Sequence, residues 1–488
     1  MAGNRPLWKW WIALAAGLLA GLVLPPWGFP PLLWLALVPL WGLGPGPAMV
    51  WGGSAVLVSH RWLLWLHPLD WVGVPLPLSL PLCLLLWLGL GALAGALVAI
   101  WRLVVQRLGA ERLSTACLAA ALWGLVEVLM AKGPLFWIGL GSAVLPGDRA
   151  LAGLAQWVGA GGLAALQLLL SWWLWRWLVG LIAQRPGHWR SATGWLALVV
   201  VLHGWGWWLV QAAQPAAATD RSLSLLVLQP AIPTREKFTG AQQQVLKRRL
   251  AAAQSQAEAL AADVLLLPEG ALALGQPLPR ATGVEVLSGG FRQDGVRLYS
   301  SLLRFQPGSL DANQALDKHR LVPLGEWIPS LDWLAWSGLS AVGGVDPGPP
   351  SRLLSRPGGA VAVAICYEVA DGTALVAASR AGAGWLLASA NLDPYPRQLQ
   401  RQFEALAQLR SLEAGRWLVS AANTGPSLVV NPAGAVIDRL PAGVAGTLPV
   451  RIAELTAITG YARVGEAPLL LLAAAGAALR VRPRMRQS

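Results

Sequence analysis

The chain has 488 residues, of which 55% are hydrophobic and only 12% are charged, and 29 of them are Trp. This composition excludes an ordinary soluble globular protein and indicates a protein that lies in a membrane. The formal net charge of +13 is uneven, because residues 1–219 hold 11 Lys/Arg against 4 Asp/Glu whereas residues 220–455 hold 21 against 19. The polar central segment is therefore almost neutral, and nucleic acid is not expected as a partner.

Apolar segments fill the first part of the chain. Most of them are long enough to cross a hydrocarbon core about 30 Å thick. We predict seven membrane spans in this part of the chain. The second is short and bounded by Pro and Gly, and we expect it to tilt or to pair tightly with the third as a hairpin. The first could pass for a signal peptide, but no small-residue cleavage site is evident and more spans follow, so it should stay attached. The seven segments cover residues 8–24, 31–44, 47–66, 77–101, 114–131, 151–183 and 194–212.

Basic residues predict the orientation, because Lys and Arg in short loops stay on the cytoplasmic side. They gather before the first span, between the fourth and the fifth, and around the turn between the sixth and the seventh. If the N-terminus lies in the cytoplasm, seven spans place the polar segment outside. The apolar stretch 467–479 then crosses back, so the arginine-rich tail that follows it is cytoplasmic. We therefore expect transmembrane helices 1 to 7 in residues 1–219, an exported domain in residues 220–455, and a final span with a cytoplasmic tail in residues 456–488.

The exported segment alternates short apolar runs with helical stretches. This order predicts a layered α/β domain in which sheet is covered by helices. The expected helices cover residues 241–261, 372–381 and 398–413. The expected strands cover residues 223–229, 264–267, 297–305, 360–365, 385–388, 417–421 and 427–430.

Cys366 is the only cysteine of the exported segment, so no disulfide can form within it. A lone thiol in an oxidising compartment is a liability unless it is buried or needed. It can be a small buried apolar residue, but Cys366 and Glu269 both follow predicted strands, where α/β folds place reactive groups. Lys318 opens a polar run between them. A thiol, a carboxylate and an ammonium that meet in space suggest thioester chemistry beside a bilayer.

Other chemistries lack their residues. A zinc site needs several His, Cys or carboxylate ligands, and the exported segment has one His and one Cys. The chain contains no Gly-x-Ser-x-Gly motif of a serine hydrolase and no Walker-type phosphate loop. Cysteine is therefore the expected nucleophile, and neither a metal nor a cofactor is implied.

Three runs carry a family resemblance. They are KHRLVPLGEWIP at 318–329, CYE at 366–368 and LPE at 267–269, and a late helix and strand at 410–425 accompany them. These runs are similar to the Lys-x-x-Leu-Val-Pro-Phe-Gly-Glu-x-x-Pro, Cys-Tyr-Glu and Trp-Pro-Glu elements of the apolipoprotein N-acyltransferases. The resemblance covers nearly the whole chain. It implies a bundle of about eight transmembrane helices and a nitrilase-like (carbon-nitrogen hydrolase) domain built as an αββα sandwich.

The resemblance also implies a reaction. Cys366 would attack the acyl ester of a phospholipid, with Glu269 as base and Lys318 stabilising the thiolate and the oxyanion. The enzyme would release a lysophospholipid, hold the acyl group as a thioester and pass it to the free α-amine of a diacylglyceryl-cysteine on an apolipoprotein. We expect a monomer among the lipids of a bacterial inner membrane, with a periplasmic catalytic domain and both termini cytoplasmic.

Supporting roles are expected of Glu326, Tyr367 and Glu368. Glu326 can assist Lys318 in catalysis or serve only as its structural partner. The backbone N–H of Tyr367 can act as a second donor to the oxyanion. Glu368 can orient Lys318 or the acceptor amine rather than titrate.

A Trp-rich stretch follows Glu326. Because Trp favours the depth of the membrane interface, Trp327, Trp333 and Trp336 are candidates for a lid that dips into the bilayer and admits lipid chains. The alternative is that this stretch is a buried part of the core.

Three positions depart from the family's motifs. They are Leu267 in place of Trp, Ser300 in place of Asn, and Leu392 within the run that stands for Ser-Asn-Asp-Ala-Trp-Phe. These changes put substrate contacts in question more than the catalytic trio. Two other functions therefore stay open, namely a membrane-tethered amidase or nitrilase-type hydrolase, and a non-catalytic lipid- or lipoprotein-binding relative.

Overall fold

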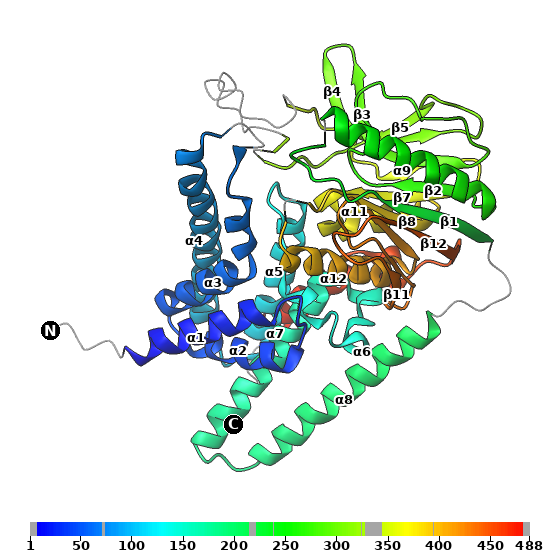
Figure 1. Cartoon of the computed structure of the whole chain (residues 1–488). Coiled ribbons are helices and arrows are strands. Elements are labelled where there is room, and N and C mark those ends of the chain that lie inside the picture. The colour runs from blue at the N-terminus through cyan, green and yellow to red at the C-terminus, as the bar shows by residue number, and fades with distance from the viewer. Residues whose placement is uncertain are drawn as a thin grey trace.

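The computed structural model of the chain consists of a helical bundle and a domain of two β-sheets (Figure 1). In Figure 1 the bundle is coloured mainly blue to cyan, and the domain mainly green to orange. The structure describes residues 7–70, 74–213, 221–237, 239–323, 325–326, 344–393 and 395–481.

Apolar helices make up the bundle. Among the described residues, four are long and apolar enough to cross a membrane, namely α4 (Leu76–Leu108), α5 (Leu113–Lys132), α7 (Ala155–Ile182) and α8 (His188–Ala212). Leu85, Leu129 and Val200 are examples of large apolar side chains that these helices expose, as expected of a surface that faces lipid. The other helices are α1 (Trp8–Val23), α2 (Pro30–Gly42), α3 (Pro45–Ser59), η1 (Arg61–Leu66), η3 (Leu140–Val144), α6 (Arg149–Ala152), α13 (Gly460–Val464) and α14 (Ala467–Val481).

The helices form where the apolar segments predicted them, with some irregularities. The third segment ends as an α-helix at Ser59 and continues as the 3-10 helix η1, and α7 is kinked at Gly159, whose φ is 62°. α2 packs mainly against α1 and α7, whereas α3 packs against α1 and α4, so the hairpin pairing of the second and third segments is wrong. The backbone is extended at Leu43 and Gly44, which directs α3 away from α2.

Two six-stranded sheets form the domain. In the order in which its strands pair, the first sheet contains β12 (Gly446–Ala453), β1 (Ser222–Gln229), β2 (Val264–Leu267), β3 (Glu285–Asp294), β4 (Arg297–Phe305) and β5 (Gln314–Asp317). The second contains β11 (Val436–Arg439), β10 (Leu428–Val430), β9 (Leu418–Ala422), β8 (Ala383–Ala390), β7 (Ala360–Ile365) and β6 (Leu353–Leu354).

Helices cover the outer faces of both sheets. α9 (Gly240–Ala259) packs on β1 and β2, α11 (Gly372–Arg380) packs on β7 and β8, and α12 (Arg397–Ala414) packs on β9 and β10. The inner faces meet where β1 and β2 contact β9. The central strands β1 to β3 and β7 to β9 run parallel and are covered on both faces. For this reason the sequences of β1, β2 and β7 to β9 are largely apolar, and β3 is the exception. The αββα sandwich is therefore confirmed.

The sequence does not predict β3, β5, β6, β11 and β12. β3 breaks the apolar pattern because it contains Gly289 and Gly290 and ends in polar residues. Gly289 has a steric reason: a Cβ there would lie 2.4 Å from the Cα of Glu269. Glycine therefore lets β3 approach the residue that follows β2.

The domain rests on the bundle through α12, which packs against α7. The carboxylate of Glu413 on α12 accepts the backbone N–H of Ala160 at 2.7 Å. The hydroxyl of Tyr367 donates to the carbonyl oxygen of Pro134, just after α5, at 2.9 Å. These contacts hold the end of β7 beside the membrane helices.

Candidate active site

Cys366 follows β7 directly and begins the 3-10 helix η4 (Cys366–Ala370). Its φ of 56° lies in the left-handed region, which residues other than glycine seldom adopt. The turn is held in part by Glu368, which accepts the backbone N–H of Ile365 at 2.8 Å. A backbone strained in this way places the buried thiol at the end of a strand, as functional sites often do.

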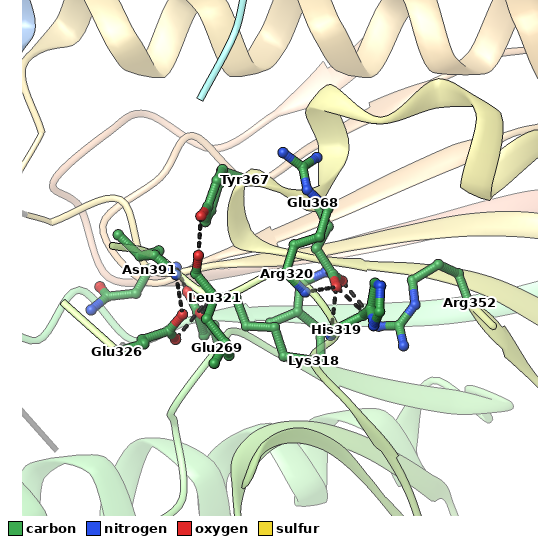
Figure 2. A network of polar contacts seen from close by, with 12 residues as sticks. Glu269, Lys318, His319, Arg320, Leu321, Glu326, Arg352, Tyr367, Glu368 and Asn391 are labelled. Carbon is green, nitrogen blue, oxygen red and sulfur yellow. Dashed lines mark hydrogen bonds and ion pairs between the residues drawn. The ribbon is translucent and has the colours of Figure 1, made fainter. Parts of the chain in front are cut away.

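Glu269 and Lys318 meet although they are 49 residues apart in the chain. Lys318 Nζ donates to Glu269 Oε1 at 2.7 Å and to Glu326 Oε1 at 2.8 Å, and the lysine side chain is fully buried (Figure 2). The backbone N–H of Asn391 donates to Glu269 Oε2 at 3.0 Å. One ammonium is therefore shared between two carboxylates, and Glu269 is held by both of its oxygens.

Burial and charge set the protonation of these groups. Burial opposes the charge of Lys318, but Glu269 and Glu326 raise its pKa well above the ordinary value, so it stays an ammonium. Burial, and then the charge of Glu269, raise the pKa of Cys366 well above that of a free thiol, against the effect of Lys318. A hydrogen bond to Glu269 adds to this rise. The resting thiol is therefore neutral and lies beside Glu269.

Glu326 closes the loop that carries Lys318. Its Oε2 accepts the backbone N–H of Val322 at 2.9 Å, while its Oε1 accepts from the lysine. Burial raises the pKa of Glu326, although Lys318 acts against this rise. Glu326 is thus an ion-pair partner of Lys318, and its charge also acts to raise the pKa of Cys366. Its part in catalysis stays a prediction.

Glu368 holds the loop of Lys318 rather than its ammonium. Its Oε1 accepts the backbone N–H groups of His319 at 2.8 Å and of Arg320 at 3.1 Å. Arg352 Nη1 lies 3.1 Å from both of its oxygens (Figure 2). Any orientation of Lys318 by Glu368 is therefore exerted through the two residues that follow the lysine.

Tyr367 joins the site to the membrane helices. Its hydroxyl donates to the carbonyl oxygens of Leu321 and Pro134. Lys318 Nζ lies 5.8 Å and Arg320 Cζ 5.3 Å from the centre of its ring, within the range of cation–π attraction. The role of its backbone N–H as an oxyanion donor stays a prediction.

Lys237 is a second buried lysine, which no motif in the sequence singled out. Its Nζ donates to the backbone carbonyl of Glu269 at 3.2 Å. Burial lowers its pKa to about 8, although the charges of Glu269 and Asp393 act in the opposite direction. In the sequence Lys237 stands in a charged loop, where a lysine is usually solvated. The neighbouring residues therefore do not predict its contact with Glu269.

An apolar cavity of about 310 Å³, here called the thiol cavity, begins at Cys366 and extends to α4. Aromatic pairs line it: Phe136 stacks on Phe403 at 5.3 Å between ring centres, and Trp62 meets Tyr395 edge-on at 5.8 Å. Such a lining suits a hydrocarbon chain better than a polar amide. The thiol cavity is further lined by Leu63, Leu66, Leu85, Leu86, Gly89, Leu90, Leu93, Pro134, Leu135, Val322, Pro323, Tyr367 and Leu399.

The departures from the family's motifs lie in the interior. Leu267, Ser300 and Leu392 are all buried, and the carbonyl oxygen of Ser300 accepts the backbone N–H of Lys318 at 2.8 Å. These positions therefore support the core and the backbone of the site. The lid candidates Trp327, Trp333 and Trp336 lie outside the described residues.

A neutral thiol, a carboxylate and an ammonium can carry out nucleophilic acyl transfer. The carboxylate can take the thiol proton, and the ammonium can stabilise an oxyanion. Within the described part of the chain, no group of three or more His, Cys, Asp or Glu residues is placed to hold a metal ion. The arrangement supports covalent catalysis by Cys366, which lines an apolar cavity.

Several known proteins are similar to this chain in sequence. The carbon-nitrogen hydrolase family model matches residues 208–460. An apolipoprotein N-acyltransferase of Prochlorococcus marinus is 48% identical over 470 residues, which cover 93% of this chain and 92% of the relative. Another, from Parasynechococcus marenigrum, is 45% identical over 472 residues, which cover 94% of this chain and 97% of the relative.

Among solved structures, an amidase of the nitrilase superfamily from Nesterenkonia aligns with a TM-score of 0.37 and 17% identity, covering 53% of this chain and 98% of the amidase. The similarity to the acyltransferases, in contrast, extends through both the helical bundle and the sandwich. The chain belongs to the apolipoprotein N-acyltransferase family.

Proposed function

We propose that this protein transfers a fatty acyl chain from a phospholipid, through a thioester on Cys366, to the N-terminal α-amine of diacylglyceryl-cysteine on apolipoproteins. The observation that carries the proposal is the connection of Cys366 to an apolar cavity that extends to a membrane helix. The Glu269–Lys318 pair beside this thiol, at 2.7 Å, provides a base and a cation. Family membership supports the same reaction.

In the first half-reaction Glu269 takes the proton of the Cys366 thiol as its sulfur attacks the ester carbonyl of the phospholipid. The carbonyl oxygen becomes an oxyanion, and the Lys318 ammonium stabilises it. The bond to the glycerol oxygen then breaks, and the proton on Glu269 passes to that oxygen. A lysophospholipid leaves, and the acyl group stays on the sulfur.

In the second half-reaction the free α-amine of the lipoprotein attacks the thioester carbonyl. Glu269 takes a proton from the attacking nitrogen, and Lys318 again stabilises the oxyanion. The carbon–sulfur bond breaks, and the Cys366 sulfur recovers its proton from Glu269. The amide product carries the acyl group, and the enzyme returns to its starting state.

Water must be kept from the thioester, because hydrolysis would waste the acyl group. The aromatic lining of the thiol cavity and the burial of Cys366 and Lys318 serve this purpose. The same lining argues against a membrane-tethered amidase, which needs a polar cleft open to water. A non-catalytic lipid-binding relative would not need the buried Glu269–Lys318 pair.

The same proposal assigns the protein to the inner membrane of a bacterium as a monomer with both termini in the cytoplasm. Residues 1–219 would supply seven spans, residues 220–455 the periplasmic catalytic domain, and residues 456–488 the last span and the tail. α14 supports this arrangement because it packs against α5 and α7. Glu326, Tyr367 and Glu368 would position Lys318 and the turn of Cys366, and Trp327, Trp333 and Trp336 would form the lid.

The test is mass spectrometry of the purified protein after incubation with phospholipid. We expect a fatty-acyl adduct on Cys366 that hydroxylamine removes and that Cys366→Ala lacks. Addition of a diacylglyceryl lipopeptide should remove the adduct and produce the N-acylated lipopeptide. A folded protein without an adduct would contradict the proposal and favour the hydrolase or the binding protein.

A further inference from the structure

A second apolar cavity, of about 250 Å³, lies inside the helical bundle and is here called the bundle cavity. Residues of α1, α3, α4 and α5 line it, together with the segment 137–140. On α4 it extends from Ala94 to Val104, whereas the thiol cavity occupies residues 85–93 of the same helix. At about 1.5 Å per residue, the stretch at the bundle cavity spans about 15 Å of the helix and the stretch at the thiol cavity about 12 Å. The two cavities therefore follow one another along α4.

A thin layer of side chains, here called the wall, separates the two cavities. Val56, Leu90 and Ala94 form one buried cluster, and Leu63 and Trp137 pack against it. Leu63 and Leu90 line the thiol cavity, whereas Val56, Ala94 and Trp137 line the bundle cavity. Because these five residues form a single cluster, the end of one cavity is the beginning of the other.

The wall is packed rather than loose. Leu90 is 6% exposed and Ala94 is 4% exposed. The ring of His60 stacks on the ring of Trp137 at 5.6 Å between ring centres and so restricts its movement. Moving these side chains aside would therefore disturb a close-packed cluster.

A thioester fixes one end of an acyl chain at Cys366, so the chain must extend along the thiol cavity toward α4. We propose that the wall stops the methyl end of this chain and so determines which chain length the enzyme takes from the phospholipid. This inference rests on the proposed function. A longer chain would have to displace the wall, and a shorter one would leave apolar side chains without contacts. Each methylene that such a pocket accepts or rejects changes selectivity by about 10- to 200-fold.

Two substitutions on α4 should move the preference in opposite directions. Leu90→Ala shortens a side chain of the wall and joins the thiol cavity to the bundle cavity, so longer chains should be accepted. Gly89→Leu adds a side chain to the thiol cavity, so shorter chains should be preferred. A Cβ at Gly89 would meet no atom within 4 Å, so the backbone accepts this change without a clash.

Gly204→Leu is the matched control. Gly204 lies on α8 and is not one of the residues that line either cavity. A Cβ added at Gly204 would also meet no described atom within 4 Å. The three variants and the wild-type protein are incubated with an equimolar set of phospholipids that differ only in the length of their saturated chains. Mass spectrometry of the Cys366 adduct then gives the distribution of chain lengths. We expect a shift of at least about tenfold in the ratio of neighbouring lengths for the α4 variants and none for the control.

The outcomes separate the inference from the function on which it rests. A wild-type adduct whose chain lengths are the same in Leu90→Ala and Gly89→Leu would overturn the wall as the determinant of length. A shift in Gly204→Leu as large as in the α4 variants would also overturn it. A folded wild-type protein without any adduct would contradict the proposed function itself. If Leu90→Ala fails to fold, Leu90→Val, which shortens the same side chain of the wall by less, takes its place, and an unchanged distribution of chain lengths there would overturn the wall.

Discussion

Two buried carboxylates near the nucleophile, Glu269 and Glu368, differ in how their charge is satisfied. Glu368 accepts three backbone N–H groups and pairs with the buried Arg352 at 3.1 Å. Glu269 shares the single ammonium of Lys318 with Glu326 and accepts one backbone N–H, from Asn391.

The difference separates a carboxylate that holds the backbone from the proposed base. Glu368 ties the turn of Cys366 to the loop of Lys318, and each of its oxygens has at least two hydrogen-bond donors, whereas each oxygen of Glu269 has one nitrogen donor among the described residues. The carboxylates of Glu269 and Glu326 share one ammonium, that of Lys318, and their charges raise the pKa of the Cys366 thiol in addition to burial. Protonation of Glu368 would break more contacts than protonation of Glu269, which is why Glu269 is the proposed base.

Glu269→Gln should have the largest effect on turnover. Loss of a general base lowers rates by about 10²- to 10⁴-fold, and we expect a decrease of this size in the rate of adduct formation on Cys366. The thermal midpoint should change little, because Lys318 keeps its contact with Glu326 at 2.8 Å. Quenched time courses followed by mass spectrometry give the rate. A variant with the wild-type rate would show that Glu269 is not the base.

Glu368→Gln should mainly affect stability. Removing one partner of a buried ion pair costs about 3–5 kcal/mol, because the buried Arg352 would lose the carboxylate that pairs with it at 3.1 Å. Unfolding in one detergent gives the difference in free energy. Glu111→Gln is the control, since Glu111 pairs with Arg176 at 2.9 Å on the surface and should lose no more than about 1 kcal/mol. Equal losses in the two variants would remove the distinction between the carboxylates.

The pH dependence of Cys366 alkylation tests the same difference through the thiol. Because its pKa is raised well above the ordinary value, the rate of alkylation should still increase with pH beyond about 8.5, where a free thiol levels off. In Glu269→Gln one cause of the raised pKa is removed while Lys318 remains, so the curve should move to lower pH. Glu368→Gln should keep the wild-type curve. A plateau near the free-thiol value in the wild type would contradict the burial and charge assigned to the site.

Tyr367→Phe should have the smallest effect. The substitution removes a hydroxyl that donates to Pro134 and Leu321, and buried acceptors left without a donor cost about 1–3 kcal/mol. We expect a modest loss of thermal stability and an acyl-enzyme that still forms. Loss of the adduct in a folded variant would show that the hydroxyl takes part in the reaction.

The sequence predicted the parts of the site that follow from motifs and strand ends. Cys366 and Glu269 follow β7 and β2, whose apolar runs are unmistakable in the sequence. Lys318 was found by its motif alone, because the strand before it, β5, is a short and half-buried run that has no apolar pattern. The catalytic roles of all three residues stay predictions until the variants are measured.

Other residues of the site could not have been predicted. Lys237 and Arg352 look like surface charges in the sequence, and their burial depends on contacts with segments more than ten residues away. β3 was missed because Gly289, which lets it pass Glu269, interrupts the apolar pattern. Leu267, Ser300 and Leu392 were expected to affect substrate contacts. Their location could not be predicted from the sequence, and in the structure all three side chains are buried.

The sequence by itself determined the class of protein: apolar segments of membrane length, an α/β domain with a lone cysteine, and the motifs of the family. Composition and periodicity are local properties, so they can be determined without knowledge of the fold. Only the tertiary structure decided that Glu269 and Glu326 share one lysine, that Glu368 is fully paired, and that a wall divides two cavities along α4. These features depend on distances between atoms that are far apart in the chain, and the packing of the sheets and helices sets such distances.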